Sequence, residues 1–255
     1  MISVIDPFYR NTYEVWENRL ATHDEIFEHF RLNRNSVLIS NIRDQLTEEI
    51  TSPLEAALYI SNKKVDHDLE NHIANFLEKS SEFKKWQNHM PSRTPKCFTD
   101  YQQSYPVSEE QLEEVNACIN RINFHLPLGQ VLFHGGKWLN QNDTMLLEKP
   151  LSTTFCPQVA LRECTWRGKA YDSGEIGLWV ITITSNNIPA FIYRIKGTKM
   201  GHEKEVLLPK GITLNIRNKN DIGIEKARKM IDTITPDEKD VPVYVYEIDA
   251  FRERN

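Results

Sequence analysis

The chain has 255 residues, of which 40% are hydrophobic and 26% charged, and its formal net charge is -5. This composition is that of an ordinary globular protein with a sizeable core. Acidic and basic residues are interspersed, so the sequence presents no broad basic field of the kind that drives sequence-independent binding to nucleic acid. We therefore expect no nucleic-acid partner.

We expect neither a cleavable export signal nor a membrane span. Its first ten residues, MISVIDPFYR, lack the basic-then-apolar run of a secretory signal, and no apolar stretch is long enough to cross a bilayer. The four cysteines form no CxxC pair and have no histidines at metal spacing. We expect a soluble protein with free thiols and no metal site.

The first half of the chain has the hydrophobic periodicity of amphipathic helices, with apolar residues three and four positions apart and charges between them. This pattern covers residues 12–20, 24–32, 36–50 and 66–86. Residues 89–98 contain two prolines and predict a loop or a break. Ser108, followed by an acidic first turn, predicts the start of a further helix.

After Pro127 short β-rich runs alternate with loops. The expected strands cover residues 130–136, 149–155, 176–184, 190–195, 203–209, 212–217 and 241–248. One helix is expected between the early strands, over residues 157–164, and residues 224–230 fit either a short helix or an exposed loop. Regular short strands behind a helical block indicate an α+β fold and not a parallel βαβ sheet.

Three segments of the predicted sheet carry residues suited to cleaving NAD at the nicotinamide bond. They are FHGG at 133–136, LSTTF at 151–155 and GHEKEVL at 201–207. Loss of nicotinamide leaves an oxocarbenium-like ribose, which a carboxylate beside the anomeric carbon stabilises. Glu205 can supply this carboxylate, and Glu203 points to the same face of an extended segment.

The ordered set of segments closely resembles the R-S-E group of ADP-ribosyltransferases, which includes bacterial toxins, secreted effectors and phage enzymes. That group has an arginine on the first core strand, a Ser-Thr-Ser-like segment on the second, and a Glu-x-Glu or Gln-x-Glu pair on a later one. The resemblance covers about residues 107–248. It implies an ADP-ribosyltransferase-like split β-sandwich, with a catalytic core at residues 107–255 behind a helical N-terminal region at residues 1–106.

The resemblance assigns roles to particular residues. Glu205 takes the place of the catalytic glutamate, and Glu203 that of the glutamate that activates the acceptor. Ser152 opens the hydroxyl segment, whose hydroxyl groups can hold the carboxylate by hydrogen bonds. In that group the backbone after the first-strand residue binds the nicotinamide amide, which points to Gly135 here. Residues 196–202 correspond to the group's substrate-recognition turn.

Further NAD-binding residues are expected around these positions. Thr153 and Thr154 are expected at the NAD site beside the first hydroxyl, and residues 156–171 are expected to cover the phosphates and nicotinamide. For Phe155, Trp166 and Tyr171 two interpretations stay open: a stacking wall for nicotinamide, or ordinary core and loop packing.

His134 stands where the R-S-E group has its arginine, and histidine there is the hallmark of the diphtheria-like group. Histidine can hydrogen-bond a ribose hydroxyl, but it cannot provide the bidentate phosphate fork of arginine. The missing cation could be Arg162, Arg167 or Arg121. We favour Arg162 and Arg167 because they lie in the expected covering loop, although solvated loop charges are an equally open interpretation.

The resemblance implies a mono-ADP-ribosyltransferase with NAD as co-substrate, a protein as acceptor and release of nicotinamide. Glu203 indicates an arginine acceptor, because a second carboxylate attracts and orients a guanidinium. A different acceptor side chain, an NAD glycohydrolase and a non-catalytic NAD-fold binding module remain alternatives. We expect a toxin-like effector that acts on a host protein in the cytosol after bacterial export without a cleavable signal.

Overall fold

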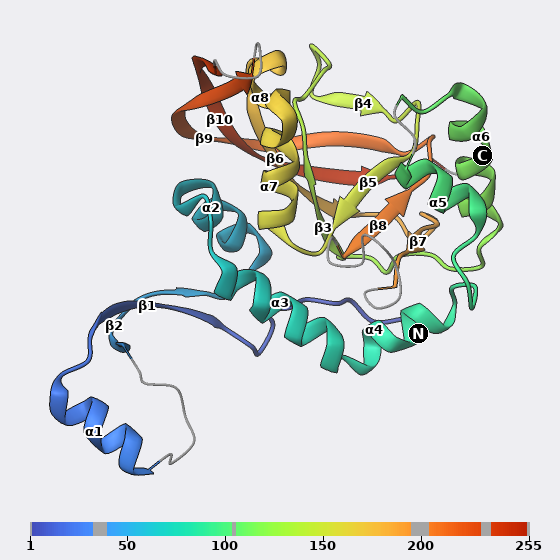
Figure 1. Ribbon diagram of the computed structural model, residues 1–255. Helices are drawn as coiled ribbons and strands as arrows, with labels where there is room; N and C mark the ends of the chain where they lie inside the picture. The colour runs from blue at the N-terminus through green and yellow to red at the C-terminus, as the bar shows by residue number, and fades with distance from the viewer. Residues whose placement is uncertain (1, 33–39, 104–105, 195–203, 231–235, 254–255) are drawn as a thin grey trace. The chain divides into compact units, whose positions relative to one another are not determined.

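The computed structural model describes residues 2–32, 40–103, 106–194, 204–230 and 236–253 (Figure 1). The chain divides into two compact units. The smaller is Phe8–Ser52, and the larger combines Met1–Pro7 with Pro53–Asn255. The functional division expected between residues 1–106 and 107–255 stays a prediction.

The smaller unit is an antiparallel pair of strands with one helix between them in the chain. Strand β1 (Tyr13–Leu20) pairs with β2 (Asn41–Ile50), and α1 (His23–Leu32) lies between them in sequence. The helices predicted over residues 12–20 and 36–50 are therefore wrong. The first segment contains aromatic and β-branched residues and the second contains β-branched residues, all of which suit strands. Each strand is stabilised by pairing with the other, which local periodicity does not register.

From Pro53 the larger unit continues with helices, and side chains cap the N-termini of α3, α4 and α6. They are α2 (Pro53–Lys63), α3 (His67–Lys79), α4 (Ser81–Asn88), α5 (Lys96–Gln103) and α6 (Glu109–Arg121). The helix predicted over residues 66–86 is two helices, because Ser80 ends α3 and its hydroxyl caps α4. Ser108 caps α6 as predicted. None of the helices in the described residues is long and apolar enough to span a membrane.

Within the described chain, eight strands form one mixed sheet in the order β4-β9-β10-β6-β3-β5-β8-β7. They are β3 (Val131–Gly135), β4 (Thr144–Leu146), β5 (Leu151–Thr154), β6 (Ile176–Ile183), β7 (Phe191–Ile192), β8 (Glu205–Leu208), β9 (Thr213–Met230) and β10 (Pro236–Phe251). The α+β class is confirmed. Residues 224–230 are neither helix nor loop, because they pair with β10 at the far end of a long hairpin (Figure 1).

The sheet is nearly divided between β3 and β5. A single pair, Phe133 with Thr154, joins these two strands. By contrast, β3 pairs with β6 over the whole of Val131–Gly135, and β5 pairs with β8 over the whole of Leu151–Thr154. The segments that the sequence singled out therefore meet at the point where the sheet divides.

Helix α7 (Pro157–Thr165), predicted over residues 157–164, packs on β3 and β6. Gly135 permits this approach, because a Cβ atom there would lie 1.9 Å from the backbone oxygen of Ala160. A 3₁₀ turn (Trp166–Gly168) and the short helix α8 (Lys169–Ser173) follow. The absence of a side chain at Gly135 thus serves helix packing directly beside the candidate site.

Candidate functional site

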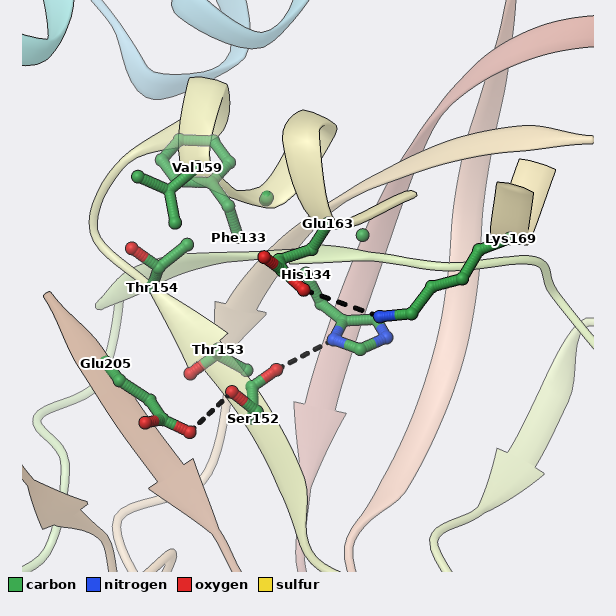
Figure 2. A pocket seen from close by; sticks show the side chains of 11 residues that line it. Phe133, His134, Ser152, Thr153, Thr154, Val159, Glu163, Lys169 and Glu205 are labelled. Carbon is green, nitrogen blue, oxygen red and sulfur yellow. Dashed lines mark hydrogen bonds and ion pairs between the residues drawn. The ribbon is translucent and has the colours of Figure 1, made fainter. Parts of the chain in front are cut away.

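Ser152 contacts both Glu205 and His134 (Figure 2). Its hydroxyl donates a hydrogen bond to Glu205 Oε1 at 2.7 Å, and its backbone oxygen lies 2.7 Å from His134 Nδ1. The strand register explains the first contact. Thr154 lies directly opposite Glu205, and Ser152 is one pleat away on the same face. Residues from three separate segments are thus brought together.

The carboxylate of Glu205 is buried and has a donor on each oxygen. The side chain is 5% exposed. While Oε1 accepts from Ser152, Oε2 accepts from Gln102 Nε2 at 2.7 Å. Gln102 lies in α5, within the helical region, and no sequence signal marked it, because its partner lies 103 positions further along the chain.

His134 carries a neutral imidazole. Burial is the main cause that lowers the pKa of His134 to about 4, with smaller contributions from the positive charges of Lys169 and Lys149. Because a carbonyl oxygen can only accept, Nδ1 holds the hydrogen that faces Ser152, and Nε2 is an acceptor. The ring packs on Trp179 at a centroid distance of 4.7 Å. His134 can therefore accept a hydrogen bond from a hydroxyl, but it supplies no positive charge.

Two cavities share His134, Gly135, Ser152 and Lys169 in their walls. The smaller, of about 130 Å³, is also lined by Glu205. The larger has a volume of about 1140 Å³. This exceeds the roughly 300 to 1,000 Å³ of ordinary ligand pockets and leaves room for a dinucleotide.

The cations in the wall of the larger cavity are lysines. Lys137, Lys149 and Lys169 line it. Arg162 and Arg167, the residues favoured from the sequence, are exposed and line neither cavity. The guanidinium of Arg167 instead lies 5.9 Å from the ring centroid of its neighbour Trp166. Arg121, the third candidate, lines a separate hollow beside Phe98.

Thr153 and Thr154 line the smaller cavity and also bond to the protein. The hydroxyl of Thr153 donates to the backbone oxygen of Val206 at 2.6 Å, which ties β5 to β8. Thr154 Oγ1 accepts from the backbone N–H of Cys156 at 3.1 Å, at the turn into α7. Both hydroxyls thus hold the strand that carries Ser152.

The three aromatic residues considered for a stacking wall, Phe155, Trp166 and Tyr171, lie outside both cavities. Phe155 is 1% exposed and packs against Phe83 and Trp86 at centroid distances of 5.6 and 5.9 Å. Trp166 is 54% exposed. The aromatic side chain next to His134 is Trp179, which also lines the larger cavity and which the sequence did not single out.

Glu203 and the expected recognition turn at residues 196–202 lie outside the described residues. The described chain resumes at Lys204, whose side chain is 4% exposed and whose φ of 53° is unusual for a residue other than glycine. Its ammonium lies 3.4 Å from Glu70 Oε1, and Gln158 Nε2 donates to Glu70 Oε2 at 3.2 Å. This partly buried network ties the start of β8 to α3 and α7.

No protein-family model matches the chain, and no curated protein sequence matches it. Solved structures similar to it include ADP-ribosyltransferase Vis, a toxin from Vibrio splendidus, at 12% identity over 76% of this chain and 90% of that chain, with a TM-score of 0.46. The C2-I component of the Clostridium botulinum C2 toxin is 11% identical over 78% of this chain and 46% of that chain, with a TM-score of 0.32. Plx2a from Paenibacillus larvae is 11% identical over 76% of this chain and 91% of that chain, with a TM-score of 0.33. Similarity of this size assigns neither a family nor an activity to this chain.

The depressed pKa of His134 predicts a specific dependence of stability on pH. Between pH 6.5 and about 4 the unfolded chain binds a proton at this residue that the folded chain does not. The free energy of unfolding should therefore fall as the pH is lowered through this range, by up to about 3 kcal/mol from this group. Chemical denaturation at several pH values should show a smaller fall in His134→Asn than in the wild type.

The exposed His67 provides the matched control. His67→Asn should keep the wild-type dependence of stability on pH. An equal fall in His134→Asn and the wild type would show that His134 is not held neutral by the fold.

Proposed function

We propose that this protein is a mono-ADP-ribosyltransferase, which cleaves NAD at the bond between nicotinamide and ribose and transfers ADP-ribose to another protein. The observation that carries the proposal is Ser152 bonded to both Glu205 and His134 at the division of the sheet. The arrangement presents a buried, doubly held carboxylate and a neutral acceptor beside a cavity for a dinucleotide. These are the groups that such a cleavage needs.

The proposed chemistry follows from the position of Glu205. When the bond from ribose C1′ to nicotinamide N1 breaks, its electron pair leaves with nicotinamide and positive charge develops on the ribose. A carboxylate has about four lone-pair positions, so it can accept from protein donors and from a ribose hydroxyl at the same time. Since Ser152 and Gln102 hold Glu205 before substrate arrives, its negative charge stabilises the transition state without reorganisation.

The walls of the larger cavity support a placement for the rest of NAD. The acceptor atom Nε2 of His134 suits a ribose hydroxyl, and Gly135 keeps the role at nicotinamide that the sequence resemblance implies. The diphosphate carries two negative charges. We place it near Lys149 and Lys169, because both line this cavity and both act electrostatically on His134.

The proposed acceptor is an arginine side chain of a target protein. This part rests on the Glu203-x-Glu205 pattern, since a second carboxylate would orient a guanidinium and take its proton as nitrogen bonds to C1′. The resemblance to toxins and effectors further suggests that the target is a host protein reached after bacterial export. Transfer to another side chain and hydrolysis by water are the alternative outcomes. A pure binding module is disfavoured, because it would have no use for a buried, doubly held carboxylate.

Release of nicotinamide from NAD, with and without a protein acceptor, tests the proposal. The wild type should release nicotinamide, and Glu205→Gln should lower kcat by at least about 100-fold, as removal of one group that stabilises transition-state charge does elsewhere. Glu113→Gln, a change to an exposed surface carboxylate, should leave the rate unchanged. Wild-type turnover in Glu205→Gln would remove this residue from the chemistry.

The position of the diphosphate can be tested by neutralising single cations. Lys149→Gln and Lys169→Gln should each weaken NAD binding, measured by calorimetry, by about 3- to 10-fold, and the loss should shrink at high salt. Arg162→Gln and Arg167→Gln are matched controls that should bind as the wild type does. Weakened NAD binding in the two arginine variants, with wild-type binding in the two lysine variants, would place the diphosphate at the arginines.

A further inference from the structure

Helix α5 contributes directly to the candidate site through Gln102, whose side-chain amide donates to Glu205 Oε2 at 2.7 Å. We infer that Gln102 is a positioning residue, which holds the Glu205 carboxylate in its catalytic orientation. This inference rests on the proposed function. It also makes the helical region, which the sequence placed outside the catalytic core, a part of the catalytic machinery.

Helix α5 is anchored against the strand that neighbours β8. Phe98 is fully buried and stacks on Phe191 of β7, with a centroid distance of 3.9 Å and an interplanar angle of 13°. The hydroxyl of Tyr193, just beyond β7, donates to the backbone oxygen of Phe98 at 3.2 Å. The backbone N–H of Tyr193 in turn donates to the backbone oxygen of Glu205 at 3.1 Å. Helix α5 and Glu205 are thus both held by the short segment from Phe191 to Tyr193.

The spacing along α5 explains why the amide reaches the carboxylate. Gln102 follows Phe98 by four residues, so the two side chains lie on one face of the helix. Because Phe98 is fixed on β7 and β8 is the next strand in the sheet, that face presents Gln102 to β8. Glu205 is the first residue of β8.

A second residue of α5 supports this assignment. Tyr101 lines the larger cavity. Burial and, secondarily, the negative charge of Glu205 raise the pKa of Tyr101 to about 12. Two consecutive residues at the end of α5 therefore contribute to the site, Gln102 by contact with the carboxylate and Tyr101 in the wall of the larger cavity.

The Gln102 amide restricts the orientation of the Glu205 carboxylate in addition to Ser152. The terminal torsion of a glutamate is broad, so each hydrogen bond from a fixed donor narrows the orientations that the carboxylate takes. Ser152 contacts Oε1 from β5, and Gln102 contacts Oε2 from a separate element, α5. Displacement of a catalytic group by about 1 Å can cost about 100-fold in rate. Gln102 should accordingly affect kcat and not the affinity for NAD.

The test compares two substitutions at this position in the full-length protein. Gln102→Met removes the donor at nearly constant side-chain length, and Gln102→Glu places a second negative charge against Glu205. Nicotinamide release should show kcat lowered by about 10- to 100-fold in Gln102→Met, and lowered further in Gln102→Glu. KM and the calorimetric Kd for NAD should change less than about twofold, because the substrate contacts remain. Gln45→Met, at an exposed position of β2, should leave all values unchanged.

Each result decides the inference. Wild-type kcat in Gln102→Met, or a Kd that weakens in parallel with kcat, would overturn the positioning role. If Gln102→Met does not fold, as judged by thermal unfolding, Gln102→Asn takes its place. Asparagine withdraws the donor by one methylene with less change in packing. This variant must also lower kcat while the Kd for NAD stays nearly unchanged. An active wild type with unaffected variants defeats this inference alone, whereas a wild type that releases no nicotinamide defeats the proposed function as well.

Discussion

The double contact of Ser152 is the interaction on which the candidate site depends. The sheet divides between β3 and β5, where only Phe133 and Thr154 pair. Across this division the backbone oxygen of Ser152 accepts from His134, while its hydroxyl donates to Glu205 within the other half. One residue therefore sets the separation of the candidate NAD anchor and the candidate catalytic carboxylate. The surrounding elements support this arrangement: α7 closes on Gly135, and the buried pair of Lys204 with Glu70 holds the start of β8.

Burial of His134 determines how charge is distributed in the site. A neutral imidazole offers an acceptor at Nε2 but cannot neutralise a phosphate. The nearby cations that line the larger cavity are lysines, which act as point charges and do not form the planar fork of an arginine. Under the proposed function, recognition of the ribose and neutralisation of the diphosphate are therefore separate tasks. Histidine performs the first and lysine side chains the second.

The sequence predicted those parts of the molecule that local pattern encodes. The strands that carry Phe133, Ser152 and Glu205 could be predicted because each combines β-forming residues with turn signals. In the sheet they follow one another in the order β3-β5-β8. Their order along the chain then indicated chemistry that requires them to meet. Ser152 and Glu205 do meet, at hydrogen-bond distance.

Features that depend on distant partners could not be predicted. Strands β1 and β2 stabilise each other across an intervening helix, and the outer half of β9 exists only because β10 pairs with it. Gln102 follows a segment that the sequence predicted as a loop or break, and its role follows from the stacking of Phe98 on Phe191. The cationic candidates were chosen by position in a loop, whereas the wall of the larger cavity contains lysines and neither arginine.

A crystal structure of Glu205→Gln with NAD tests the central claim most directly, because the substitution slows cleavage while keeping the size of the side chain. The account predicts that the nicotinamide ribose lies between His134 and position 205, with a ribose hydroxyl bonded to His134 Nε2 and the diphosphate beside Lys149 and Lys169. NAD bound elsewhere, with the Ser152 contacts unchanged and the two cavities unfilled, would contradict it.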